Sequence, residues 1–300
     1  MLNTGSESKG NESALEKDPF RSKQVQIDWS KRDIEQRLGF GGGRYTSPNK
    51  VLAFLIGMIL TIGFYVLIIY LQRWAELRWL TAMFLERGVC PYPTMFLFFW
   101  ALAVLFLKWR KIAMQTETLA LPLMPQEPDF VLTPDTARAV RDRVSALVDN
   151  PHRFILINRI DLALANLHNI GRTGDVATIL KIQAENDEAQ IASSYSLVNG
   201  FLWAIPVLGF IGTVLGLSQA IGAFTGTLEA GGDLDAIRQS LRMVTGGLST
   251  AFETTLVALV CALILQLLVS VLQMRESEFL DACNDICHKH VAGKLRLSNI

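Results

Sequence analysis

The sequence predicts an all-α membrane protein with four transmembrane helices and a cytoplasmic helical domain. Half of the 300 residues are hydrophobic and only 19% are charged, against about 25% in an average soluble domain. The charged residues leave four long stretches free of charge, and the Lys and Arg residues gather in alternate segments. No alternation of apolar and polar residues typical of β-strands is found.

The four uncharged runs have the length that a membrane helix needs. They cover residues 51–71, 89–107, 189–228 and 254–274, and about 20 residues suffice to cross a bilayer. We expect the second helix to begin near Pro93, because proline is tolerated in the first turn of a helix but not in its interior. Buried helices of a large soluble protein are the alternative, and four separate runs of spanning length argue against it.

The basic residues predict the orientation in the membrane. Residues 1–50, 108–188 and 275–300 together hold 23 of the 28 Lys and Arg residues, and the other two loops hold 5. The positive-inside rule therefore places both termini and the central segment in the cytoplasm. The first apolar run starts too late and is too long for a signal peptide. The 28 acidic residues balance the 28 basic ones, which excludes a basic nucleic-acid binder.

We expect five segments along the chain. They are a cytoplasmic N-terminal segment (1–50), transmembrane helices 1 and 2 with a short periplasmic loop (51–107), a cytoplasmic helical domain (108–190), transmembrane helices 3 and 4 with a periplasmic helix at 233–244 (191–274), and a cytoplasmic C-terminal tail (275–300). Residues 1–22 are polar enough to predict disorder.

Residues 23–38 form an amphipathic helix in this prediction. It either lies on the cytoplasmic membrane surface or packs against its own protein. The glycine-rich stretch 39–44 that follows is a flexible joint and not a phosphate loop, because it lacks the Gly-Lys-Ser/Thr ending.

Three helices are expected in the cytoplasmic domain, after a proline-rich connector at 112–130. The first begins at Pro134 with Thr133 as its N-cap and ends near residue 148. The second covers about 152–170. The third starts at Asp175, meets no glycine or proline for several turns, and should continue unbroken into the third transmembrane helix.

Each of the last two transmembrane helices carries one narrow face of small residues. Because small residues let membrane helices approach closely, each face serves either tight packing or a pore. Thr213 and Thr255 lie near the centres of these faces. Each hydroxyl either bonds a carbonyl of its own helix or contributes to a shared polar ring. The faces consist of Gly209, Thr213, Gly216, Ala220 and Ala223, beside Gly212, on the third helix, and of Gly247, Ala251, Thr255, Ala258 and Ala262 on the fourth.

These residues carry a resemblance to a known family. A string of Pro206, Gly209, Gly212, Thr213 and Gly216 is followed about 30 residues later by Gly247, Ala251 and Thr255. The two strings resemble the MotA/TolQ/ExbB proton-channel family over about residues 175–275. On that resemblance Thr213 and Thr255 match the two pore-lining threonines of the ExbB and TolQ branch, and Pro206 matches the proline at the inner end of that helix.

The resemblance implies an ion-conducting subunit of an inner-membrane rotary motor. It implies a homopentamer in membrane lipid around a dimer of a single-span MotB/ExbD/TolR-like partner, whose Asp carries the transported H+ or Na+. No other cofactor, metal or nucleic acid is expected. Four spans resemble MotA while the pore motif resembles ExbB, and this combination is similar to the motors of the Zorya anti-phage system. The process that the motor drives stays open.

Glu253 is an acid at the start of the fourth span. At 100° per residue it lies about 160° from Thr255, and a carboxylate at the bilayer centre costs roughly 3 kcal/mol or more. It is either bonded to a neighbouring helix at a subunit interface or lies, with Thr250 and Thr254, on the path by which the ion enters. In the second case Glu253→Gln lowers ion flow and leaves the pentamer intact.

Two other functions remain as alternatives. A non-conducting scaffold that recruits cytoplasmic proteins would tolerate loss of both threonine hydroxyls. A solute transporter predicts inverted repeats, which the sequence lacks. No catalytic constellation of residues indicates an enzyme. The group Cys283, Cys287, His288 and His290 fits no common zinc spacing and is expected in a solvated amphipathic tail.

Overall fold

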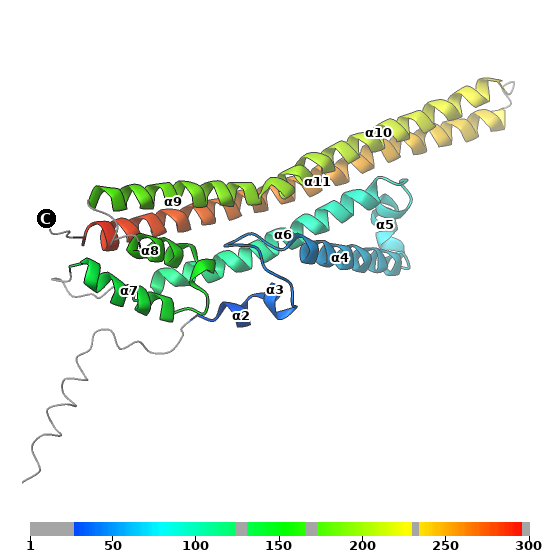
Figure 1. Ribbon diagram of the computed structural model, residues 1–300. Helices are drawn as coiled ribbons and strands as arrows, with labels where there is room; N and C mark the ends of the chain where they lie inside the picture. The colour runs from blue at the N-terminus through cyan, green and yellow to red at the C-terminus, as the bar shows by residue number, and fades with distance from the viewer. Residues whose placement is uncertain (1–26, 124–130, 166–172, 230–233, 296–300) are drawn as a thin grey trace, which may run out of the picture. The chain divides into compact units, whose positions relative to one another are not determined.

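The computed structural model describes residues 27–123, 131–165, 173–229 and 234–295 (Figure 1). Within these ranges every regular element is helical, and β pairing is limited to two isolated bridges. Four helices are long and apolar enough to cross a membrane: Lys50–Leu71, Pro91–Ala120, Val176–Gly222 and Ile237–Ala292. The predicted fold class, an all-α protein with four transmembrane helices, is confirmed.

The chain divides into two compact units. The first, called here the cytoplasmic unit after the side of the membrane that the basic residues predict for it, consists of Met1–Thr46, Lys111–Ile191 and Glu276–Ile300. The second, called here the membrane unit, consists of Ser47–Arg110 and Ala192–Arg275. Residues 275–300 were expected as a cytoplasmic tail; the last helix continues through them to Cys287, and Glu276–Ile300 belong to the first unit.

The membrane unit begins with helix α4, Lys50–Leu71. The side chain of Asn49 caps this helix by accepting a hydrogen bond from the backbone N–H of Val51 at 2.9 Å. A 3-10 turn and the short helix α5, Arg78–Leu85, lie in the loop between the first two spans. Helix α6, Pro91–Glu117, begins two residues before Pro93, near which its start was expected; a proline at the first helical position loses no hydrogen bond.

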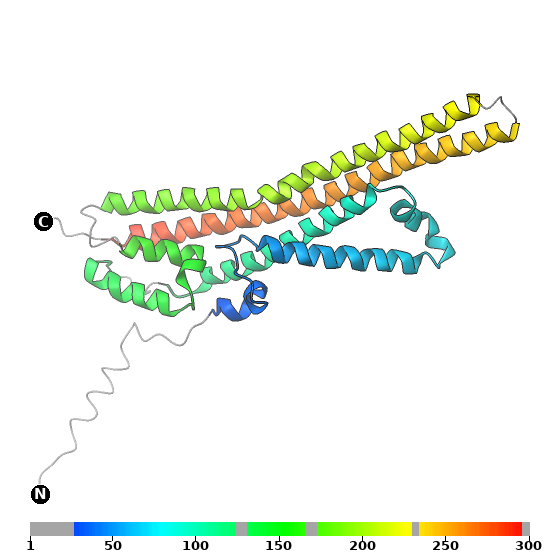
Figure 2. The same ribbon diagram turned by 45° about the vertical axis from the view of Figure 1, so that its right-hand side comes forward.

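The other two long helices are α10, Ser196–Glu229, and α11, Leu234–Cys287. Figures 1 and 2 show that they run side by side within the membrane unit. The short helix expected at 233–244 is not separate, because α11 passes through Gly246 and Gly247 without a break; Asp233 itself lies outside the described residues.

Helix α9, Thr173–Ser194, is separated from α10 by one residue, Tyr195. The expected continuation into the third span is present as the candidate span Val176–Gly222, with a departure from regular α-helix at this one residue. The N–H of Tyr195 bonds the carbonyl of Ala192, three residues back, at 3.2 Å, which tightens the turn. The Tyr195 ring is buried with the Lys108 ammonium 4.1 Å from its centroid, and such a tertiary contact leaves no trace in the local sequence.

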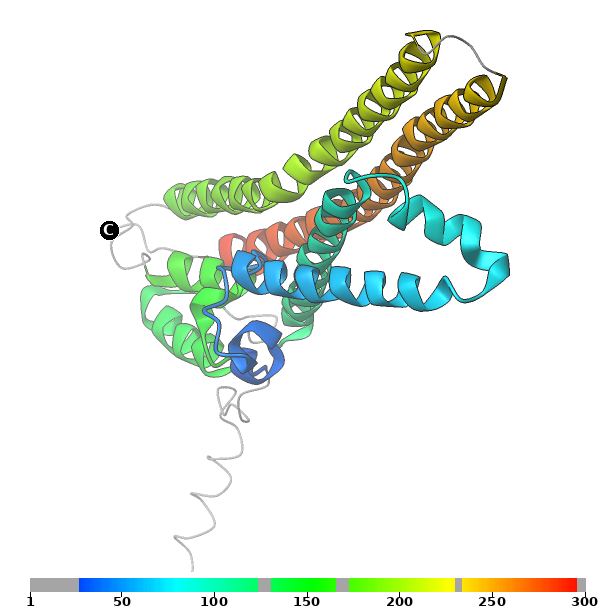
Figure 3. The same cartoon turned by 90° about the vertical axis from the view of Figure 1, so that its right-hand side faces the viewer.

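The cytoplasmic unit contains the neighbouring helices α7, Pro134–Ala146, and α8, Ile155–Ala165, both green in Figure 3. Helix α7 starts as predicted, with Thr133 as N-cap in a capping box with Thr136. Helix α8 starts three residues later than expected, because Pro151–Arg153 form a 3-10 turn. The expected continuation of α8 to Ile170 lies outside the described residues, as do residues 1–22 and residues 124–130 of the connector. The connector predicted at 112–130 is wrong in its first part, because α6 continues to Glu117 and a 3-10 turn follows at Thr118–Ala120.

The predicted amphipathic helix at 23–38 is wrong as a single element. It consists of α2, Trp29–Arg32, and α3, Ile34–Arg37, divided at Asp33. The Asp33 carboxylate accepts hydrogen bonds from the backbone N–H of Glu35 and from the Trp29 indole. Trp29 is fully buried, with its ring 5.1 Å from that of Phe154. Of the two placements expected for this segment, the structure shows packing against its own protein.

Two ion pairs lie inside the cytoplasmic unit. Lys111 of α6 pairs with Glu35 at 2.6 Å, and both side chains are at most 2% exposed. Arg159 of α8 pairs with Asp187 of α9 at 2.6 Å, with both side chains 1% exposed, and also donates to Asn284 of α11. Arg159 therefore holds three helices together at one buried point.

Cys283 and Cys287 are both buried and reduced beside this point. The expectation that they lie in a solvated tail is wrong, because the end of α11 is packed into the cytoplasmic unit. Within the described ranges no three His, Cys, Asp or Glu side chains are grouped closely enough to hold a metal.

Breaking the buried ion pair at Arg159 should destabilise the cytoplasmic unit. We expect Asp187→Asn to lower the free energy of unfolding by about 3–5 kcal/mol, because it leaves a buried guanidinium without a counter-charge. Asp161→Asn is the control, since its partner Arg141 is 46% exposed and exposed pairs contribute about 0–1 kcal/mol. Thermal unfolding of the purified protein, followed by circular dichroism, measures both; equal losses would contradict the assignment.

Candidate functional site

Helices α10 and α11 touch backbone to backbone at Gly216 and Gly247. A Cβ placed on Gly216 would lie 2.6 Å from the carbonyl oxygen of Gly247, and one on Gly247 would lie 2.6 Å from that of Gly216. Real Cβ atoms do not approach a carbonyl so closely, so only glycine allows this contact at either position. The two glycines fix both the distance and the register of the helix pair.

The contact continues along both helices through small residues. A Cβ on Gly212 would meet the Thr254 hydroxyl at 2.4 Å, and one on Gly209 would meet the Ala258 methyl at 2.6 Å. Gly209, Gly212 and Gly216 of α10 and Ala251, Thr254 and Ala258 of α11 are all buried. Of the two uses considered for the small-residue faces, these positions serve tight packing.

The two predicted threonines lie at one edge of this contact. The Thr255 hydroxyl donates to the carbonyl oxygens of Gly209, across the helix pair at 3.1 Å, and of Ala251, in its own helix at 3.2 Å. The Thr213 hydroxyl donates to the carbonyl of Phe210 at 2.6 Å. Both side chains are half-buried. Each hydroxyl proton is thus directed at a backbone carbonyl, which leaves the oxygen free to accept a hydrogen bond from a group beside it.

Thr250 and Thr254 are placed differently. The Thr254 hydroxyl is buried and donates to carbonyls of its own helix, with Thr250 as the nearer acceptor at 2.9 Å. The Thr250 hydroxyl donates to the Gly246 carbonyl at 3.0 Å. Both are satisfied by α11, as often occurs for threonine in membrane helices.

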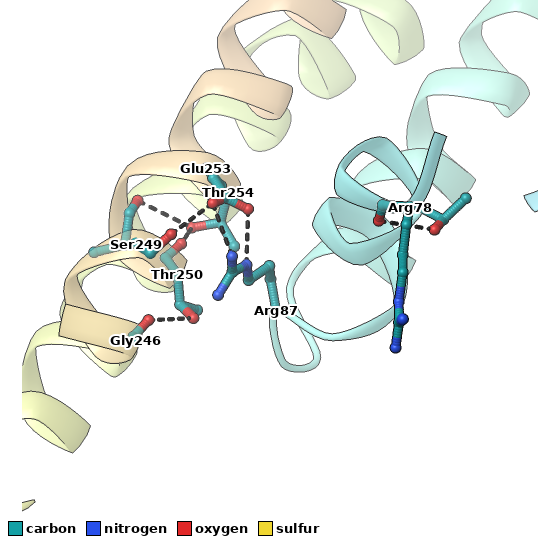
Figure 4. A network of polar contacts seen from close by, with 9 residues as sticks. Arg78, Arg87, Gly246, Ser249, Thr250, Glu253 and Thr254 are labelled. Carbon is teal, nitrogen blue, oxygen red and sulfur yellow. Dashed lines mark hydrogen bonds and ion pairs between the residues drawn. The ribbon is translucent and has the colours of Figure 1, made fainter. Parts of the chain in front are cut away.

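Glu253 forms a charge cluster with Arg87 (Figure 4). Arg87 donates from Nε to Oε2 at 2.7 Å and from Nη2 to Oε1 at 2.9 Å, and the Ser249 hydroxyl donates to Oε1 at 2.6 Å. Arg87 follows α5, and Gly88, at φ +80°, turns the chain toward α6 in a conformation that other residues rarely adopt. The partner of Glu253 therefore lies in the same chain, 166 residues away, and not on a neighbouring subunit.

Sequence reasoning missed Arg87. Its only signal was its place among the three basic residues of the loop 72–88. Opposite charges so far apart in sequence cannot be paired without the fold. Both side chains of the pair are 24% exposed, so the pair is partly shielded.

The Glu253 edge of α11 faces the first half of the membrane unit. Val257 and Cys261 follow Glu253 at one-turn spacing and are buried, and the Cys261 sulfur lies 3.9 Å from that of Met95 in α6. Glu253 and Thr255 stand about 160° apart on the helix. The threonine edge is therefore the edge of α11 turned away from α6, and the two predicted groups of site residues do not form one cluster.

Pro206 lies inside α10 and is half-buried. A proline in a helix interior removes the hydrogen bond to the carbonyl four residues back and crowds that carbonyl. The missing hydrogen bond lies two turns before Thr213, toward the end of α10 that follows α9.

The comparisons with known proteins give one match. Residues 150–284 match the MotA/TolQ/ExbB proton channel family. This region contains α8, α9, α10 and most of α11, and with them both threonines and all the glycines of the helix contact. No curated protein and no solved structure matches the chain.

Replacing either contact glycine should separate the helices. We expect Gly216→Ala or Gly247→Ala to destabilise the protein by about 1–3 kcal/mol, because the added methyl group meets a carbonyl oxygen that belongs to the facing helix. Gly246→Ala is the matched control, since a Cβ there meets no atom within 4 Å and alanine favours a helix by up to about 1 kcal/mol over glycine. Melting temperatures in detergent separate the two cases, and equal stability of all three variants would exclude the contact.

The Arg87–Glu253 pair should behave as a coupled unit. Arg87→Gln and Glu253→Gln should each lower the melting temperature, because each leaves one charge without its partner. The double variant should lose less than the two single losses together, by a coupling energy of about 0.5–3 kcal/mol. Strictly additive losses would show that the two side chains do not interact.

Proposed function

Because this chain belongs to the MotA/TolQ/ExbB proton channel family over residues 150–284, we propose that it is the ion-conducting subunit of a membrane motor. In this proposal five copies surround a dimer of a single-span MotB/ExbD/TolR-like partner in a bacterial inner membrane, with both termini of each copy in the cytoplasm. Ion flow through the centre does mechanical work. The observation that carries the proposal is the position of Thr213 and Thr255 together on one edge of the α10–α11 pair.

This edge can present hydroxyl groups to a central pore. This edge faces away from α6. Helix α6 contacts the Glu253 edge and therefore does not cover the threonines. The residues beside it are large, apolar and exposed in the single chain, which leaves room for neighbouring copies on either side. They include Phe210 and Val214 of α10 and Phe252 and Leu259 of α11.

The proton carrier in this proposal comes from the partner. Residues 189–228 and 254–274 contain no Asp or Glu, and Glu253 is occupied by Arg87 and Ser249 on the other edge. A carboxyl group is therefore needed from another chain, and an Asp on the single-span partner supplies it. Glu253 then acts through the position of α11 and not as a carrier of the ion.

The threonines can respond to the charge of that carboxyl group. A protonated carboxyl donates its O–H to a threonine oxygen, whose own proton stays on a backbone carbonyl. An ionised carboxylate only accepts, so the hydroxyl must rotate its proton from the carbonyl toward it. The two protonation states thus need opposite orientations of the hydroxyl, which gives the partner two different contacts with the ring and a reason to move between subunits.

The test is ion flux in vesicles that contain this chain and its single-span partner. We expect Thr213→Val or Thr255→Val to lower proton flux about tenfold or more, because each removes a hydrogen bond of about 1.4 kcal/mol or more at the step that limits flow. Thr225→Val and Thr245→Val are matched controls, one on each helix, since both hydroxyls are exposed and bond their own helix.

The same experiment addresses the alternative. A non-conducting scaffold would show no flux above that of empty vesicles and would keep its cellular activity in the Thr213→Val/Thr255→Val double variant. Replacing the proton gradient by a sodium gradient identifies the ion.

A further inference from the structure

A pocket opens between α6 and α11 within the membrane unit. Its volume is about 330 Å³, near the lower end of roughly 300–1,000 Å³ for small-molecule sites. Its lining is apolar except for one residue at one end. The lining includes Leu105, Phe106 and Trp109 of α6 and Leu268, Val271 and Arg275 of α11.

The pocket runs from the hydrocarbon region to the cytoplasmic boundary of the membrane. Its apolar residues belong to the uncharged runs that end at residues 107 and 274, and Arg275 is the first charged residue after the second of these runs. Trp109 is 49% exposed and stands among the basic residues that mark the cytoplasmic side. Tryptophan is enriched at this level of a bilayer.

Arg275 is exposed and has no hydrogen-bond or ion-pair partner among the described residues. A cation without a partner at the mouth of an apolar pocket is complementary to a molecule with an anionic end and a long apolar part.

We propose that this pocket binds one acyl chain of an anionic phospholipid, whose phosphate pairs with Arg275. The inner leaflet supplies the lipid directly, because the pocket opens within the bilayer. Basic sites between transmembrane helices on the cytoplasmic side suit such head groups. The proposal depends on the membrane spans alone and does not rest on ion conduction.

Trp109 supplies the probe for the test. The full-length protein is placed in vesicles with increasing fractions of phosphatidylglycerol or phosphatidylcholine carrying brominated acyl chains, which quench tryptophan fluorescence on contact. The chain has six Trp residues, so the signal of Trp109 is the difference between the wild type and Trp109→Phe. We expect half-maximal quenching of Trp109 at a severalfold lower fraction of phosphatidylglycerol than of phosphatidylcholine.

Two variants decide what causes the preference. Arg275→Gln should quench equally with both lipids, whereas Arg110→Gln should keep the preference, since Arg110 is exposed at the same level of α6 but does not line the pocket. An unchanged preference in Arg275→Gln would overturn the proposal. So would equal quenching by both lipids in the wild type, which indicates ordinary surrounding lipid, or no quenching of Trp109 by either, which indicates that a second copy closes the pocket.

Discussion

Two helices in a bilayer gain little by burying apolar side chains against each other, because the lipid they leave is equally apolar. Helices α10 and α11 instead approach until backbone meets backbone, with Gly216 and Gly247 each standing where a Cβ would reach the carbonyl of the other. The close approach adds dispersion contacts and allows weak Cα–H···O interactions of about 0.5–1 kcal/mol each. The positions of Thr213, Thr255 and Glu253 depend on this contact, because it sets the register and rotation of both helices.

That rotation separates two kinds of polar group. Thr213 and Thr255 lie on one edge of the helix pair, where their oxygens can accept a hydrogen bond. Glu253 lies on the other edge, where Arg87 and Ser249 satisfy it. If the charged pair lay beside the threonines, it would compete with their hydroxyl groups for any ion or acid that approached. The separation keeps the fixed charges in a structural contact and leaves the threonine edge neutral.

The sequence determined the elements whose signals are local. Uncharged runs of spanning length, the Thr133–Pro134 helix start and the small-residue spacing around Thr213 and Thr255 all depend on neighbours within a few turns. From these signals the all-α fold class with four spanning helices and the family that matches residues 150–284 could both be predicted. Local reasoning failed where a distant residue changes a helix. The expected helix at 23–38 is divided at Asp33, whose side chain accepts from the Trp29 indole, while Trp29 packs against Phe154.

The tertiary structure alone decided how the polar residues are paired. A helical wheel gives the angle between Thr255 and Glu253, but it does not say which edge another helix covers. Arg87 meets Glu253 across 166 residues, and Arg159 meets both Asp187 and Asn284, because folding brings together charges that the chain keeps far apart. The sequence by itself determined that two threonines lie on faces of small residues. The packing of α11 against α6 decided that both lie on the edge of the helix pair that α6 does not cover. The physical reason is that the role of a charge or a hydroxyl depends on the groups that the fold places beside it.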